Sequence, residues 1–118
     1  MTKSALASGL VLAALAGLAG LGARAEDDED AVSKGRALAA AKCARCHAIG
    51  RDDKSTHPAA PPFRAVVERY PPEYLAEALA EGIVSGHPDM PVFVLEPAEI
   101  DAFLAYLEEL REAQKSPL

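Results

Sequence analysis

The chain has 118 residues, of which 12 are basic and 18 acidic, and half of all residues are hydrophobic. This length supports a single domain, and a net charge of −6 disfavours binding to nucleic acid or to an anionic membrane surface. Aromatic residues make up only 5% and tryptophan is absent, so a core built from side chains alone would be thin. A small domain of this kind usually needs a stabilising cross-link or a buried cofactor.

Residues 1–25 match a secretory signal peptide. Lys3 supplies a positive start, residues 5–21 are apolar and uncharged, and Ala23-Arg24-Ala25 fits a small-x-small cleavage site. The alternative is an uncleaved membrane anchor through residues 4–22, but this run is near the lower length limit for a spanning helix. We therefore expect cleavage, export to the periplasm and no stable membrane insertion of the mature protein.

Residues 26–32 would then open the mature chain, and they begin with five consecutive acids, Glu26 to Asp30. Runs of like charge repel one another and stay disordered, so we predict an acidic disordered N-terminus followed by a folded domain over residues 33–118. We interpret the run as a solvated spacer, with an electrostatic docking tail as the alternative. Loss of residues 1–25 leaves 10 basic and 18 acidic residues, a net charge near −8.

The first helix of the domain is expected to start at Ser33, as N-cap, and to continue through Lys42. It leads directly into Cys43-Ala44-Arg45-Cys46-His47, which is the C-x-x-C-H pattern of covalent haem attachment. Residues three apart in a helical turn share one face, so both thiols can reach the two vinyl groups of one haem. The adjacent His47 is then placed to bind the iron as proximal ligand.

Two other chemistries could use the same cysteines. Cys43 and Cys46 could form a redox-active dithiol, but no βαβ pattern surrounds them. A zinc module could combine them with His57 and His87, although those spacings are irregular and His47 would have no role. A disulfide between the two cysteines would close a very small loop and add little stability.

Residues 50–63 are expected to form a loop, because they contain Gly50, two aspartates and three prolines. A metal-bound histidine usually donates its other ring N–H to a backbone carbonyl or a carboxylate. The Pro61-Pro62 segment is a candidate source of that carbonyl, and an ordinary proline-rich turn is the alternative. We interpret His57 as a surface histidine of this loop.

Three further helices are predicted, over residues 64–68, 73–81 and 97–111. Pro72 precedes the second, which Gly82 closes, and its apolar stripe comprises Tyr74, Leu75, Ala78 and Leu79. The last has the strongest helical pattern, a stripe flanked by Tyr106 and made of Ile100, Phe103, Leu104, Leu107 and Leu110. This stripe should pack on the small Gly35/Ala39 face of the first helix, so that the two helices cross closely. No segment has the sustained alternation of a strand.

Met90 is the only methionine besides Met1, and it lies between Pro88 and Pro91 in a loop. A thioether sulfur is a soft ligand suited to haem iron, and ligation by methionine and histidine raises the reduction potential. A gap-filling core methionine is the alternative reading. His87 is a rival sixth ligand, because imidazole also binds iron.

From about residue 33 to residue 110 the chain resembles the class I c-type cytochromes, the small monohaem cytochrome c family. The resemblance is carried by the C-x-x-C-H motif, the proline-flanked Met90 and Ala105-Tyr106-Leu107. It implies an all-α cytochrome c fold, with three to five helices packed around one covalently attached haem c (heme c). The family pairs a glycine and an aromatic residue on the first helix; here these positions are Gly35 and Ala39, and Phe103 and Tyr106 would compensate.

The resemblance also implies roles for the site residues. Cys43 and Cys46 would form the haem thioethers, His47 and Met90 would bind the iron, and Pro62 or Pro61 would accept the hydrogen bond of His47. With both axial positions filled, the expected function is one-electron transfer between redox partner proteins rather than enzymatic catalysis. A cytochrome subunit of a periplasmic dehydrogenase complex is the alternative.

Overall fold

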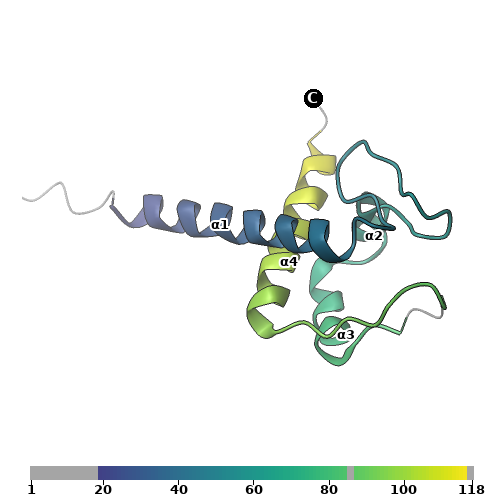
Figure 1. Ribbon diagram of the computed structural model, residues 1–118. Coiled ribbons are helices and arrows are strands. Elements are labelled where there is room, and N and C mark those ends of the chain that lie inside the picture. Colours follow the sequence, from purple (N-terminus) through teal and green to yellow (C-terminus); the bar gives the residue numbers. More distant parts are fainter. Residues whose placement is uncertain (1–18, 85–86, 117–118) are drawn as a thin grey trace, which may run out of the picture.

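The computed structural model describes residues 19–84 and 87–116. The elements in chain order are α1 (Ala19–Lys42), α2 (Phe63–Arg69), the 3₁₀-helix η1 (Pro72–Leu75), α3 (Ala76–Glu81) and α4 (Pro97–Lys115). Figure 1 shows α1 and α4 crossing, with α2, α3 and the two long loops on one side of the crossing. The described residues contain no strand, so the prediction of an all-α fold is confirmed.

The crossing of α1 and α4 is centred on Gly35. A Cβ atom built on Gly35 would lie 1.9 Å from the backbone oxygen of Ala102 and 2.8 Å from Cβ of Tyr106. Ala39, one turn further along α1, is completely buried. Because only small residues allow two helix backbones to approach this closely, the predicted packing of the Gly35/Ala39 face against the last helix is confirmed.

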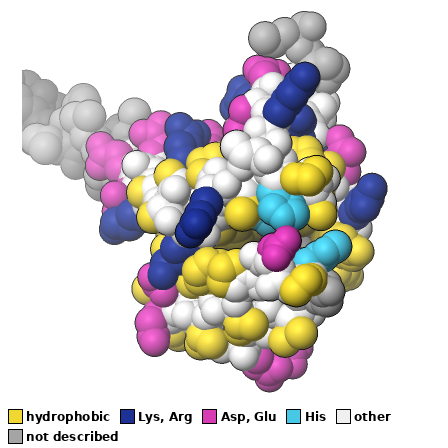
Figure 2. Space-filling view, turned by 45° about the vertical axis from the view of Figure 1, so that its right-hand side comes forward, with side chains coloured by type: hydrophobic (Ala, Val, Ile, Leu, Met, Phe, Trp, Pro, Cys, Tyr) yellow, Lys and Arg dark blue, Asp and Glu magenta, His cyan; other side chains and the backbone are white. Residues whose placement is uncertain are grey.

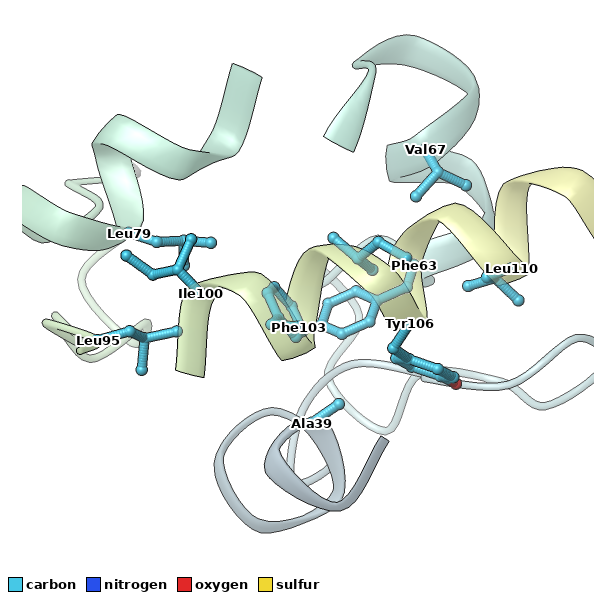
Figure 3. Close-up of a cluster of buried hydrophobic side chains, with 10 residues drawn as sticks. Ala39, Phe63, Val67, Leu79, Leu95, Ile100, Phe103, Tyr106 and Leu110 are labelled. Carbon is cyan, nitrogen blue, oxygen red and sulfur yellow. The ribbon is translucent and has the colours of Figure 1, made fainter. Parts of the chain in front are cut away.

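The core lies around α4, which contacts α1 on one side and α2, η1 and α3 on the other. Phe63 of α2 meets Phe103 of α4 edge to face, with 5.7 Å between the ring centroids (Figure 3). The members of the predicted stripe on α4 are buried, apart from the half-buried Leu104. The buried cluster comprises Ala39, Phe63, Val67, Leu79, Leu95, Ile100, Phe103, Tyr106, Leu107 and Leu110.

The start of α1 corrects the prediction of a cap at Ser33. The helix begins at Ala19, so residues 26–32 are helical rather than disordered. An ion pair between Asp30 and Lys34, 2.6 Å apart and one turn from each other, supports the helix through the acidic run. Residues 1–18 of the predicted signal peptide lie outside the described residues. Among those that are described, no helix is both long enough and apolar enough to cross a membrane.

The middle of the chain departs from the prediction in one respect. The single helix expected over residues 73–81 is divided into η1 and α3, and Tyr74 is 72% exposed instead of buried. A 3₁₀ turn has three residues per turn, so Tyr74 is rotated away from the face that carries Leu79. Gly82 closes α3 as predicted: its φ is +100° and its N–H donates to the Ala78 carbonyl at 2.8 Å.

Candidate functional site

The C-x-x-C-H segment follows α1 directly as a helix-like turn. The Cys43 N–H donates to the Ala39 carbonyl at 2.8 Å, and the His47 N–H donates to the Cys43 carbonyl at 2.9 Å. Cys43 and Cys46 are therefore about one turn apart; both are half-buried and neither is in a disulfide. This spacing can present two thiols to one edge of a flat ligand.

The environment of Cys43 disfavours the dithiol alternative. Burial raises the pKa of its thiol to about 11, and the nearby Lys42 ammonium only partly opposes this. Redox-active dithiols instead depend on a thiol whose pKa is lowered. Within residues 19–84 and 87–116, no three His, Cys, Asp or Glu side chains gather closely enough to hold a metal ion.

The His47 ring is oriented by a backbone carbonyl and by the core. Its Nδ1 lies 2.7 Å from the Pro61 carbonyl oxygen. Since a carbonyl can only accept, Nδ1 is the donor, and in the neutral ring Nε2 then has a free lone pair. The ring also packs against Phe63, with 5.2 Å between centroids. A neutral imidazole fixed in this way is what binding of iron by histidine requires.

Of the two candidate prolines, Pro61 rather than Pro62 is the partner of His47. Pro62 is the N-cap of α2, and its carbonyl accepts from the Ala65 and Val66 N–H groups at 2.9 and 3.2 Å. A carbonyl that enters the first turn of a helix is not free to face His47. The sequence contained a signal for this, because a helix predicted to begin at residue 64 uses the carbonyls just before it.

The loop after the motif is shaped by hydrogen bonds that the sequence reasoning missed. The Asp53 carboxylate accepts from the N–H groups of Ile49 and Gly50 at 3.2 and 2.9 Å, and Ser55 Oγ accepts from the Ala48 N–H at 3.0 Å. The Phe63 N–H then donates to the Ala48 carbonyl at 2.9 Å. These bonds bring the two ends of the loop together, so that Pro61 faces His47. Aspartate and serine shortly after Gly50 are the recognisable signal for such turns.

Met90 lies in the loop between α3 and α4, at the end of a turn in which its N–H donates to the His87 carbonyl at 3.2 Å. Met90 is half-buried, whereas the rival ligand His87 is exposed. The adjacent Asp89 contacts His57, with 3.2 Å between Oδ2 and Nε2. The loop that carries Met90 therefore touches the loop that follows the C-x-x-C-H segment. His57, interpreted from sequence as a surface histidine of its loop, makes this contact.

The two loops bound one face of the molecule. Figure 2 shows hydrophobic side chains on both sides of a hollow on this face, with histidine and acidic side chains grouped at its edge. A separate hollow of about 340 Å³ lies between α1, residues 49–53 and α4, and its lining includes none of the predicted site residues. The face between the two loops is thus the candidate binding site.

The residues of this face fit a haem by their donor chemistry. The Cys43 and Cys46 thiols are unbridged and lie about one turn apart, and in its neutral form His47 presents an unprotonated Nε2. The Met90 thioether lies on a loop that contacts the loop following the C-x-x-C-H segment. Imidazole nitrogen and thioether sulfur are axial ligands of electron-transferring haems, and paired thiols form the covalent links.

Comparison with known proteins agrees with this chemistry. Residues 30–107 match the model of the family described as cytochrome c oxidase, cbb3-type, subunit III. The chain is 34% identical over 77 residues to cytochrome c-552 of Bradyrhizobium diazoefficiens, a match that covers 65% of this chain and 72% of that protein. No solved structure matches the chain. Because the family match spans well over half of the sequence, the chain belongs to this family and is a small c-type cytochrome, an electron-transfer haem protein.

Proposed function

We propose that the protein is an exported one-electron carrier, with one haem c held covalently by Cys43 and Cys46 and ligated by His47 and Met90. The observation that carries the proposal is the hydrogen bond from His47 Nδ1 to Pro61, which leaves Nε2 available for iron. When bound, the haem supplies one-electron chemistry by cycling between Fe(III) and Fe(II). With His47 and Met90 as its two protein ligands, the iron would have no position left for a substrate.

Two contacts would hold the His47 ring in one place while the iron changes its oxidation state. Pro61 and Phe63 fix the His47 ring, and Phe63 rests in turn on Phe103 in the core. Phe63 and Phe103 are both buried, so they would limit the access of water to the inner side of His47. Exclusion of water disfavours the more highly charged ferric form, so it raises the reduction potential in the same direction as a thioether ligand does.

Covalent attachment is tested on a denaturing gel stained for haem. The exported wild-type chain should keep its haem after denaturation, because thioether bonds survive unfolding. The Cys43→Ser/Cys46→Ser double variant should lose it. A colourless mature protein, or haem that leaves the denatured wild-type chain, would overturn this part of the proposal.

Ligation by Met90 is tested by the absorption band that marks sulfur-ligated ferric haem. Wild type should show the band, Met90→Ala should lose it and have a lower reduction potential, and His87→Ala should keep it as the matched control. The opposite pattern, with no band in wild type and a spectrum altered by His87→Ala, would assign the sixth position to His87.

Export and processing are also part of the proposal. Cleavage after Ala25 would release a mature chain that begins at Glu26 in the periplasm. Mass spectrometry of the exported protein should give this N-terminus. A chain that retains Met1 in the membrane fraction would instead establish an anchor through residues 4–22.

The mature charge near −8 suggests redox partners that dock through basic surfaces. The rate of electron transfer with such a partner should fall as ionic strength rises, because salt screens the attraction between exposed charges. A rate that does not change with salt would exclude electrostatic docking.

A second candidate is that the protein serves as the cytochrome subunit of a larger redox complex. The matched family is described by an oxidase subunit, and exposed apolar residues surround the Met90 loop: Val84, Val92 and Val94 are 83%, 59% and 64% exposed. A stable complex with an oxidase or a dehydrogenase should co-purify from gently solubilised cells. Recovery of the cytochrome alone supports the free carrier.

A further inference from the structure

His57 is joined by hydrogen bonds to both halves of the site. Its backbone N–H donates to the Cys46 carbonyl at 3.2 Å, which ties it to the C-x-x-C-H turn. The Ala59 N–H lies 3.1 Å from its Nδ1. Because an N–H can only donate, Nδ1 is the acceptor and the proton of the neutral ring is on Nε2. His57 therefore donates from Nε2 to Asp89 Oδ2, at 3.2 Å.

A neighbouring bond strengthens the attachment of this segment to the motif. The Thr56 hydroxyl donates to the Arg45 carbonyl at 2.5 Å. Thr56 and Arg45 immediately precede His57 and Cys46, so this bond lies next to the one between those two residues. Residues 56 and 57 are thus held by residues 45 and 46, and His57 extends from that fixed segment toward the methionine loop.

Asp89 immediately precedes Met90 in the other loop. Beyond Met90, this loop is secured by the Lys42 ammonium, 5.9 Å from the Phe93 ring centroid, and by the Leu95 N–H, which donates to the Leu79 carbonyl at 2.9 Å. Those contacts lie several residues from Met90, whereas the contact of Asp89 is at its neighbour. Movement of Met90 away from the site would therefore pull directly on the His57–Asp89 contact.

We propose that His57 and Asp89 form a strap that positions Met90 over the haem iron and resists its displacement. The inference rests on the proposed ligation by Met90. Neither residue touches the iron, so both are positioning residues. The strap raises the population of the loop conformation in which Met90 is in place, and a competing ligand must first break it to reach the iron.

The size of the effect follows from the exposure of the pair. The His57 side chain is 32% exposed and that of Asp89 is 73% exposed, so water and salt weaken their interaction. Loss of a partly exposed pair of this kind should change the affinity of a competing ligand by about two- to fivefold.

The strap is tested by titrating the ferric haem protein with imidazole and measuring the loss of the sulfur-ligation band. His57→Ala and Asp89→Ala should each bind imidazole about two- to fivefold more tightly than wild type. The double variant should bind it no more tightly than either single variant, because both remove the same contact. His57→Gln, which retains an N–H donor, should restore most of the wild-type resistance.

Asp30→Ala is the matched control for the loss of a carboxylate. Asp30 has a 63% exposed side chain and an ion pair with Lys34, but it lies in α1, far along the chain from both loops. Its imidazole affinity should equal that of wild type. A similar gain in this control would attribute the effect to net charge and overturn the strap.

The outcomes separate failure of the strap from failure of the ligation. If wild type shows the sulfur band, but the single variants bind imidazole like wild type or their effects add in the double variant, the strap is wrong and ligation by Met90 stands. If wild type lacks the band, the proposed ligation is wrong, and hydrogen exchange of the Met90 amide tests the contact itself. Faster exchange in both single variants, with no further increase in the double variant, supports the strap as a loop contact; unchanged exchange overturns it.

Discussion

The α1–α4 crossing and the Met90 loop are held together in opposite ways. At the crossing, the backbones approach so closely that Gly35 has no room for a Cβ atom, and Tyr106 is only 4% exposed. The loop instead depends on a few polar and backbone contacts, and it leaves Val92 and Val94 more than half exposed. We therefore expect the crossing to determine the stability of the fold and the loop to determine the position of Met90.

This difference separates the stability of the fold from the identity of the sixth ligand. A close helix crossing has no alternative arrangement of similar energy, so damage there should unfold the whole domain. A loop with few buried contacts can open locally at lower free energy while the helices stay packed. Variants of the crossing should thus shift global unfolding, and variants of the loop should shift the sulfur band alone.

The strongest challenge to this comparison is Gly35→Ala. The added Cβ would overlap the Ala102 backbone, so we expect a loss of about 3 kcal/mol or more in the free energy of unfolding of the haem protein. Chemical denaturation followed by circular dichroism measures this loss. Ala37→Leu, at an exposed position on the same helix, should change stability by less than about 0.5 kcal/mol. Wild-type stability in Gly35→Ala would show that the crossing is loose.

Gly82→Ala tests the Met90 loop at the residue where it leaves α3. Gly82 has a φ of +100°, a region that other residues rarely adopt, and its Cβ would lie 2.8 Å from Val92 Cγ1. We expect a local cost of about 2 kcal/mol, seen as loss of the sulfur band on heating well before the helices melt. The neighbouring exposed variant Glu81→Ala should behave like wild type. Simultaneous loss of band and helices in Gly82→Ala would contradict the separation of the two regions.

Tyr106→Phe returns to the crossing with a smaller change. The Tyr106 hydroxyl donates to the Ile49 carbonyl, so its removal leaves an acceptor in a partly buried place at a cost of about 1 kcal/mol. Tyr74→Phe is the control, because Tyr74 is 72% exposed. Urea denaturation at neutral pH compares the two variants. Equal stability of both would mean that this hydrogen bond adds nothing.

The same variant should alter the response to alkaline pH. Burial raises the pKa of Tyr106 above its ordinary value of 10.0. Above that pH the unfolded chain loses this proton while the folded protein retains it, so the contribution of Tyr106 to stability falls as pH rises through its folded pKa. Tyr106→Phe should therefore lose less stability than wild type between neutral and strongly alkaline pH.

The smallest expected effect comes from Lys42→Gln, which removes the cation over Phe93 at the far end of the methionine loop. An exposed cation–π contact contributes about 0.5 kcal/mol, so the sulfur band should melt slightly earlier while global unfolding stays unchanged. Substitution of the exposed Lys54 by Gln is the control for the loss of charge. If Lys42→Gln lowered the melting temperature of the sulfur band more than Gly82→Ala does, this order of the loop contacts would be wrong.

The sequence predicted well those features that depend on near neighbours. Pro97 and the apolar stripe of α4 are local signals, as is the C-x-x-C-H motif, and the end of α1 at Lys42 follows from the motif. The close crossing could be expected from Gly35 because a residue without a side chain permits it. Each of these features is written in a segment of about one or two helical turns.

The features that could not be predicted depend on competition between two local structures or on contacts between residues far apart in the sequence. Ser33 looks like an N-cap, but a cap is worth about 1 kcal/mol and a continuous alanine-rich helix outweighs it. The contact of His57 with Asp89 joins residues 32 apart, and no local pattern marks it. The exposure of Tyr74 depends on a 3₁₀ turn that the spacing of apolar residues does not reveal.

Removal of the proposed leader would place the acidic run of α1 in a different environment. In the full chain, Glu26 to Asp30 lie in the middle of a helix, where their charges repel one another. After cleavage at Ala25, the same carboxylates would occupy the opening turns of the helix, next to unpaired N–H groups and the positive end of its dipole. Cleavage would thus move a run of like charges from the middle of a helix to its N-terminus, where negative charge is stabilising.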